Sequence, residues 1–305
     1  MCKHLIRSLS SYLILFLATP AFADYMPVDG PLEEPVEVSV DGPAEWPVKA
    51  PATAQAKETA EMPAESPWRL GIALGYGERT NPLVQSDDIR IGIDIDIAWF
   101  GKRWFFDNGD VGFTVTDRGP VTFNIVARLN SDRVFFSKTD SDYISVLDAQ
   151  GGITLQTVSV PDRDYALELG AEVLANGDWG YLQASVHRDV SDTHNGVEAY
   201  LNVGRSFRQH RWAFEPSVGI SWKSSELNDY YWGVREDEAN FMFPAYRADS
   251  GINMHTRFAA SYVMDKHWTF LLIAEYERLN SAAAASPVVE QRDVVGAFAG
   301  FRYGF

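Results

Sequence analysis

Hydrophobic and polar residues alternate along most of the chain from Trp68 onward, in runs of about ten residues. In the run near 89–99 the apolar face holds Ile91, Ile93, Ile95, Ile97 and Trp99, which alternate with Gly92, Asp94, Asp96 and Ala98. The same period of two recurs near 119–129, 164–175, 211–223, 267–278 and 293–305. Because successive side chains of a strand point to opposite faces of a sheet, this pattern predicts strands with one apolar and one polar face.

The length of the runs and the aromatic rings at their ends favour a membrane barrel over a soluble β-sandwich. Strands of globular proteins average about 5–6 residues, whereas a tilted strand that spans a membrane needs about 9–11. Trp212 and Trp222 lie on one face of one run. At about 3.3 Å per residue and roughly 40° of tilt, they are about 25 Å apart along the membrane normal, the height of the apolar band of an outer-membrane barrel. The chain also ends in an alternating aromatic strand, Phe301 to Phe305.

We therefore expect an all-β fold, a transmembrane antiparallel up-and-down β-barrel over residues 68–305, with about twelve strands. The expected strands lie near 68–77, 89–99, 102–107, 110–117, 119–129, 164–175, 179–190, 195–206, 211–223, 255–265, 267–278 and 293–305. Short turns alternate with longer connections, as in barrels with short periplasmic turns and long outer loops. Asn108-Gly109 predicts a two-residue hairpin after the third strand, and without that hairpin the count would be odd. An even count places both ends of the barrel in the periplasm.

Two segments precede the barrel. Residues 1–23 are typical of a secretory signal peptide, with Lys3 and Arg7 ahead of an apolar stretch. Residues 24–67 are acidic and rich in proline, which blocks helices and sheet ladders. We expect this segment to be a disordered periplasmic tether. It is either an inert spacer or a docking segment for a partner, for which Trp46 is the best candidate anchor.

Composition narrows the class of protein. The 305 residues include 26 Lys+Arg and 42 Asp+Glu, so the formal net charge is −16. A nucleic-acid partner is excluded, because nucleic-acid binding requires a positive surface. No stretch after the signal reaches the roughly 18 consecutive apolar residues of a spanning helix. The single cysteine, Cys2, lies within the signal peptide, so the mature chain has no disulfide and no thiol chemistry.

The polar faces of the expected strands carry charges of both signs, which we expect to line the lumen of the barrel. Because unpaired charges in a narrow lumen are costly, we expect them to form a network that holds the barrel in shape; a narrow solute path is the alternative. The candidate lumen-lining charges are Arg69, Asp94, Asp96, Arg128, Glu168, Glu172, Glu198, Arg211, Glu215, Arg257, Glu275 and Arg302.

A search for catalytic and metal-binding patterns gives no site. His187 and His194 lie near a serine and two aspartates, but His187 is expected to face the lumen and His194 to lie in a loop. There is no Gly-x-Ser-x-Gly elbow and no His-Glu-x-x-His zinc pattern, and the histidines are too scattered for a metal site. We predict no catalytic residue, no metal and no cofactor.

Several short motifs occur in a characteristic order between residues 68 and 305. They are Asp189-Val190-Ser191, His194-Asn195-Gly196, Tyr231-Trp232-Gly233-Val234, Ala285-Ser286-Pro287-Val288-Val289 and the closing Gly300-Phe301-Arg302-Tyr303-Gly304-Phe305. This order resembles the MltA-interacting protein (MipA)/OmpV family of outer-membrane β-barrel proteins. The resemblance implies a non-enzymatic scaffold that brings a murein hydrolase together with a murein synthase, or an envelope protein of the stress response.

Three functions remain open at this point. The leading hypothesis is an outer-membrane scaffold, with outer-membrane lipid around the barrel and a periplasmic murein hydrolase/synthase complex as partner. The alternative is a narrow outer-membrane channel for small solutes. A third possibility, a lipid hydrolase carried by the barrel, depends on His187 or His194.

Overall fold

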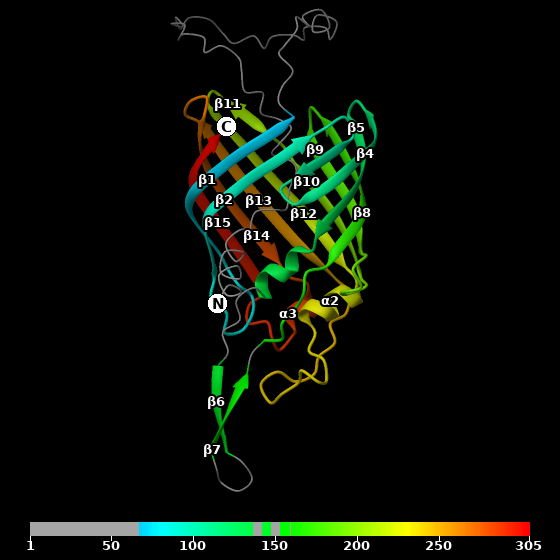
Figure 1. Cartoon of the computed structure of the whole chain (residues 1–305), viewed down its shortest axis with the longest axis vertical. Helices are drawn as coiled ribbons and strands as arrows, with labels where there is room; N and C mark the ends of the chain where they lie inside the picture. The colour runs from blue at the N-terminus through cyan, green and yellow to red at the C-terminus, as the bar shows by residue number, and fades with distance from the viewer. Residues whose placement is uncertain (1–66, 137–141, 148–152, 159) are drawn as a thin grey trace, which may run out of the picture. The chain divides into compact units, whose positions relative to one another are not determined.

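The computed structural model describes residues 67–136, 142–147, 153–158 and 160–305, and its main feature is one large antiparallel sheet (Figure 1). The predicted signal peptide and residues 24–66 of the predicted tether, which include Trp46, lie outside the described residues. The strands of the sheet are β1 (Trp68–Arg79), β2 (Ile89–Phe100), β3 (Trp104–Asp107), β4 (Asp110–Arg118), β5 (Val121–Leu129), β8 (Leu167–Gly177), β9 (Gly180–Asp189), β10 (Val197–Gly204), β11 (Phe207–Gln209), β12 (Trp212–Lys223), β13 (Gly251–Val263), β14 (Trp268–Arg278) and β15 (Asp293–Gly304).

The sheet closes on itself. Each strand pairs antiparallel with its neighbours around the ring, and β1 pairs with β15 from Gly71–Gly304 to Arg79–Gly296. The three-residue β11 follows β10 after Arg205-Ser206, and both pair with β12, so they share one position in the ring. The result is a closed antiparallel barrel with twelve strand positions, and the predicted fold class is confirmed.

The predicted third strand, on whose hairpin the even strand count depends, is present but short. β3 pairs with β4 from Trp104–Phe113 to Asp107–Asp110. The two turn residues have positive φ angles, 48° at Asn108 and 108° at Gly109, as a tight hairpin between twisted strands requires. The even strand count therefore holds.

Exposed and buried side chains alternate along the strands. In β15, Val294 and Phe298 are buried, whereas Val295 and Phe301 are exposed on the other face. Aromatic pairs lie on the outer face near the strand ends, such as Trp68–Trp99 with ring centroids 6.3 Å apart and Trp268–Tyr303 at 5.1 Å. A continuous exposed apolar belt of this kind is stable against lipid and costly in water.

A β-bulge in β1 interrupts the simple alternation of β2. The pairing moves from Leu74–Ile93 to Gly77–Ile91, so two residues of β1 oppose one residue of β2. Paired residues share a face, and Gly77 faces inward, so Ile91 turns to the interior and is 4% exposed. The unbroken isoleucine pattern had placed Ile91 on the outer face, and this placement was wrong because sequence alternation does not reveal a bulge.

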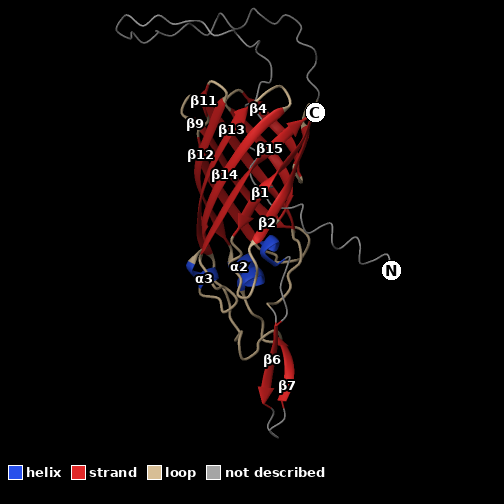
Figure 2. Ribbon diagram, turned by 90° about the vertical axis from the view of Figure 1, so that its left-hand side faces the viewer, coloured by secondary structure: helices blue, strands red, loops and turns tan. Residues whose placement is uncertain are grey.

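Long and short connections lie at opposite ends of the barrel. Both ends of the barrel chain, Trp68 and Phe305, lie at the end with the short turns. The long connections contain the 3-10 helix η3 (Ser131–Phe136), α2 (Ser225–Trp232) and α3 (Ser281–Ala284), which cluster at the other end (Figure 2). One connection also contains the hairpin β6 (Asp142–Leu147) and β7 (Ile153–Val158). Among the described residues, no helix is both long and apolar enough to span a membrane.

Candidate functional site: the charged interior and the capped mouth

An ion cluster joins three strands in the half of the barrel that is nearer to the long connections. Arg128 of β5 donates to Glu168 of β8 at 3.0 Å and also contacts Glu198 of β10. Asn130 donates to the second oxygen of Glu168 at 2.7 Å. Lys223, at the end of β12, lies 3.9 Å from Glu198, so its ammonium group extends the cluster. Glu168 is fully buried, and these contacts supply its polar partners.

A second cluster lies toward the short-turn end. Arg69 contacts Asp96 at 3.2 Å and Asp107 at 3.0 Å, and Arg302 contacts the other oxygen of Asp96 at 2.5 Å. These side chains come from β1, β2, β3 and β15, so the cluster joins the last strand of the ring to the first three. A separate ion pair lies on β13 and β14, where Arg257 contacts Glu275 at 3.0 Å.

Two of the candidate carboxylates are held by neutral donors. Glu172 accepts hydrogen bonds from Asn124 at 3.0 Å and from Gln183 at 2.7 Å. Glu215 accepts from the Tyr181 hydroxyl at 3.1 Å and from Ser206 at 3.1 Å. Hydrogen bonds of this kind offset part of the cost of burying a carboxylate.

Two candidate charges do not join these clusters. Arg211 precedes β12 in an exposed turn, and its guanidinium donates to the carbonyl of Met264 at 3.1 Å. Asp94 points inward from β2, but no basic side chain of the described residues lies within ion-pair distance of it. Most of the candidate lumen-lining charges therefore take part in ion pairs or side-chain hydrogen bonds inside the barrel, whereas, within the described residues, Arg211 and Asp94 do not.

Sequence reasoning missed three members of the clusters. Lys223 continues the inward series of β12, two residues after Ser221, so the period of two already contained it. Asp107 was within the short third strand. Asp132 lies in η3 and binds Lys223 through both carboxylate oxygens, at 2.6 and 2.7 Å. No periodic signal could have identified Asp132, because its position depends on how a long connection folds back into the barrel.

A hydrophobic cluster, which we call the mouth cap, covers the end of the barrel with the long connections. Phe136 of η3 packs on Tyr231 and Trp232 of α2, with ring centroids 6.0 and 5.8 Å apart. The buried side chains of the mouth cap are Leu83, Val134, Phe135, Phe136, Val160, Leu227, Tyr231, Trp232, Val234, Phe243, Ala248, Leu279, Ala283, Val288 and Val294. Segments from five connections or strand ends thus form a small core of their own.

Polar contacts fasten the mouth cap to the barrel wall. The Asn280 side chain donates to Asn253 of β13 at 2.9 Å, and Asn253 donates to Glu277 of β14 at 2.8 Å. Another asparagine side chain, Asn81 after β1, donates to the Phe135 carbonyl of η3 at 3.0 Å. With the Lys223–Asp132 pair, these bonds attach η3 and α3 to strands on several sides of the barrel.

An arginine and a glutamate connect two of the long connections. Arg163 contacts both carboxylate oxygens of Glu238, at 2.8 and 3.0 Å, and donates to the carbonyl of Gly233 at 2.9 Å. Partial burial alone would raise the pKa of the Glu238 carboxyl. The hydrogen bonds from Arg163 and the Arg235 backbone outweigh burial and hold this pKa below its ordinary value.

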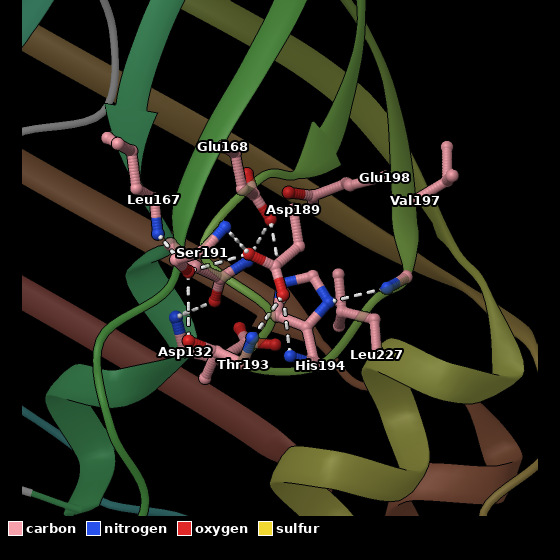
Figure 3. Close-up of polar contacts among 12 residues, drawn as sticks. Asp132, Leu167, Glu168, Asp189, Ser191, Thr193, His194, Val197, Glu198 and Leu227 are labelled. Carbon is pink, nitrogen blue, oxygen red and sulfur yellow. Dashed lines mark hydrogen bonds and ion pairs between the residues drawn. The ribbon is translucent and has the colours of Figure 1, made fainter.

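The motif at 189–196 is a loop anchor (Figure 3). The Asp189 carboxylate accepts hydrogen bonds from the backbone N–H groups of Ser191, Thr193 and His194, each at 2.7 Å. It also accepts from the N–H of Asn195 at 2.8 Å and from the Ser191 hydroxyl at 2.7 Å. One carboxylate therefore satisfies most donors of the tight connection between β9 and β10.

The geometry of this loop does not assemble a nucleophile and a base. The Ser191 hydroxyl contacts Asp189 and Thr193 and accepts from the N–H of Leu167. The His194 ring accepts from the N–H of Gly196 through Nδ1 at 2.9 Å, and its Nε2 lies 3.3 Å from Glu168. His187 is buried in β9, and neither nitrogen of its ring has a hydrogen-bond partner among the described residues. Within the described ranges, no group of three His, Cys, Asp or Glu side chains has the arrangement of a metal site.

Comparison with known proteins agrees with the closed barrel. Outer membrane protein Omp26La of Vibrio anguillarum is 23% identical over 214 residues, which cover 69% of this chain and 74% of that protein. Outer membrane protein OmpV of Vibrio cholerae is 27% identical over 211 residues, 68% of this chain and 72% of that protein. MltA-interacting protein of Escherichia coli K12 is 25% identical over 131 residues, 43% of this chain and 53% of that protein.

The relatives and the barrel together locate the protein in the outer membrane, as the exposed apolar belt requires. The family model described as MltA-interacting protein MipA matches residues 70–305, the whole barrel apart from its first two residues. The chain belongs to the MltA-interacting protein MipA family.

Proposed function

We propose that this barrel is a non-enzymatic scaffold that binds murein enzymes at its short-turn end, which faces the periplasm. The observation that carries the proposal is the asymmetry of the two ends: the mouth cap covers one end, whereas the other bears short turns and both ends of the barrel chain. The tether, attached to Trp68, would then emerge beside any partner bound there. A relative named MltA-interacting protein supports a murein enzyme as that partner.

The capped mouth argues against an open channel along the barrel axis. Opening such a path would separate Asp132 from Lys223, whose side chains are both almost fully buried. Breaking a buried ion pair costs about 3–5 kcal/mol, and the aromatic packing of Phe136 on α2 would be lost as well. This cost favours a binding role over free axial passage of solutes.

Affinity capture tests the scaffold proposal. The full-length protein, purified from outer membranes in mild detergent, should retain a murein hydrolase or a murein synthase from a periplasmic extract. Deleting residues 24–67 should reduce that recovery if the tether contributes, and Trp46→Ala should do so to a smaller extent because it removes one anchor.

Folding of each variant is the control: each must show the heat-modifiable gel mobility of a folded barrel. If recovery of both murein enzymes is unchanged by the deletion, the tether has no part in the mechanism. If neither enzyme is recovered with the intact protein, the scaffold proposal fails.

A further inference from the structure

The barrel wall has a break beside β2. This strand pairs with β1 from Ile89 to Trp99, but with β3 only through Ala98, Trp99 and Phe100. At Ile97 the turn residue Asn108 terminates the ladder: its side chain accepts from the Ile97 N–H at 2.9 Å, and its own N–H donates to the Ile97 carbonyl at 2.9 Å. Beyond this point, no strand among the described residues lies along β2 on the side away from β1.

We call this break the wall notch. The β2 segment Ile89–Ile97 borders it on one side, and the Asn108-Gly109 turn forms its floor. Leu129, at the end of β5, lies across from β2, since β4 pairs with β5 only up to Val111–Ala127. At roughly 3.3 Å per residue, the free edge of β2 is about 25–30 Å long, a large part of one strand.

An unpaired strand edge is unusual in this setting. Barrels normally leave no edge, and a backbone N–H or C=O facing hydrocarbon without a partner is costly. Such an edge is tolerated where it borders a polar opening. A Cβ built on Gly92 would meet no described atom within 4 Å, so no described side chain packs against the edge at this point. Since the mouth cap covers the end of the barrel, a ligand that reached the free edge of β2 would come from the side of the barrel.

The two sides of the wall notch differ in chemistry. On the outer face its border is apolar, with Ile93, Ile97 and Leu129 exposed by 49%, 39% and 53%. On the inner face, Asp94 points inward from β2 and Asp110 from the start of β4. In the described part of the chain, no basic side chain lies within ion-pair distance of either aspartate.

The basic side chains near the floor are already engaged. Arg69 is shared between Asp96 and Asp107, and Arg302 binds Asp96. Two further arginines act on Asp94 or Asp110 from a distance, and both have carboxylate partners: Arg128 binds Glu168 and Glu198, and Arg257 binds Glu275. The inner side of the wall notch therefore has carboxylates in excess of nearby cations. A ligand that complements both sides has an alkyl chain for the outer border and a positive head group for the inner one.

We propose that the wall notch binds a cationic amphiphile from the outer leaflet. Its alkyl chain lies against Ile93, Ile97 and Leu129, and its head group passes the free edge of β2 to reach Asp94 and Asp110. This binding is independent of any partner at the short-turn end.

Fluorescence quenching in lipid nanodiscs tests the proposal. A dodecyl trialkylammonium that carries a nitroxide serves as the probe, and the reporter is a fluorophore on Ile93→Cys. The only native cysteine, Cys2, lies in the predicted signal peptide, so the mature chain is labelled at one position. The matched control is Val218→Cys, an exposed outward position on β12, which is paired on both sides.

We expect quenching at position 93 to reach half-saturation at about ten-fold lower probe concentration than at position 218, and an anionic dodecyl sulfate analogue to show no such difference. Asp94→Asn with Asp110→Asn should raise the half-saturation at position 93 by about ten-fold, as the loss of a close charge contact allows. The matched charge control, Glu236→Gln with Asp237→Asn in an exposed loop, should leave it unchanged. Equal half-saturation at the two labelled positions, or no effect of the aspartate variants, overturns the proposal.

A second variant closes the wall notch without removing a charge. Inserting four alternating residues on each side of Asn108-Gly109 lengthens the hairpin along the free edge of β2. If the lengthened barrel keeps its heat-modifiable mobility, positions 93 and 218 should be quenched at the same half-saturating probe concentration. A half-saturation that remains lower at position 93 contradicts a lateral site. If the lengthened hairpin prevents folding, the aspartate variants alone decide.

Discussion

Arg128 offers the sharpest test of the ion clusters, because one guanidinium serves two buried carboxylates. It binds Glu168 at 3.0 Å and also contacts Glu198. Arg128→Met keeps most of the side-chain length and removes the charge. The substitution leaves two buried carboxylates from different strands facing each other without the cation between them.

The remaining contacts of the two carboxylates set the size of the effect. Removing one partner of a buried ion pair typically costs about 3–5 kcal/mol. Glu168 keeps its hydrogen bond from Asn130 and the contact with His194. Among the described residues, Glu198 keeps the more distant Lys223, at 3.9 Å. We therefore expect the free energy of unfolding to fall by about 3 kcal/mol, the lower part of that range.

Reversible urea unfolding of the barrel in lipid vesicles measures this loss. The matched control is Arg278→Met, because Arg278 is 50% exposed and lies 3.9 Å from Asp293, so its removal should cost about 0–1 kcal/mol. Adding Glu198→Gln to Arg128→Met should restore part of the loss by removing one uncompensated charge. If Arg128→Met and Arg278→Met unfold with the same free energy, the interior cluster does not stabilise the barrel as described.

Three further predictions concern packing, the loops and conduction. A Cβ at Gly170 would lie 2.3 Å from the His187 ring, so Gly170→Ala should lower the free energy of unfolding by about 1–3 kcal/mol. The control is Gly296→Ala, whose Cβ would have no atom nearer than 3.6 Å, and an equal loss of free energy in this control would contradict the packing argument. The pKa of Glu238 lies below its ordinary 4.5, so its stabilisation of the loops is present above that value and is lost as the pH falls through the folded-state pKa. Proteolysis of the loop at 234–250 should therefore become faster as the pH is lowered. If the Glu238→Gln variant shows the same acceleration in acid as the unmodified protein, the Arg163 contact has no part in it. In planar bilayers the protein should give no stepwise current, because the mouth cap closes the barrel axis; regular steps would favour the channel alternative.

The barrel was predictable because its signal is local. A period of two, strand lengths near ten residues and the Asn108-Gly109 turn each depend on neighbouring residues only, and together they gave the strand number. The same alternation selected most residues of the ion clusters, and it also contained Lys223. Which charges pair was not predictable, because partners such as Arg128 and Glu198 are seventy residues apart.

The mouth cap and the wall notch were not predictable, because each depends on contacts or register between distant segments. The cap residues Phe136 and Tyr231 come from two long connections without periodicity. The wall notch follows from how short β3 is relative to β2, and Ile91 turned inward through a bulge in β1. The 189–196 motif was recognised as a sequence pattern, but its role as a loop anchor required the five bonds to Asp189.

Residues 68–305 form a closed barrel embedded in outer-membrane lipid, and electrophoresis of washed outer membranes, with and without boiling in detergent, can check this. We expect the protein to stay with the membranes, to migrate as a compact species when unheated, and to move to a different mobility after boiling. Recovery of the protein in a detergent-free periplasmic extract, or one mobility under both conditions, would contradict it.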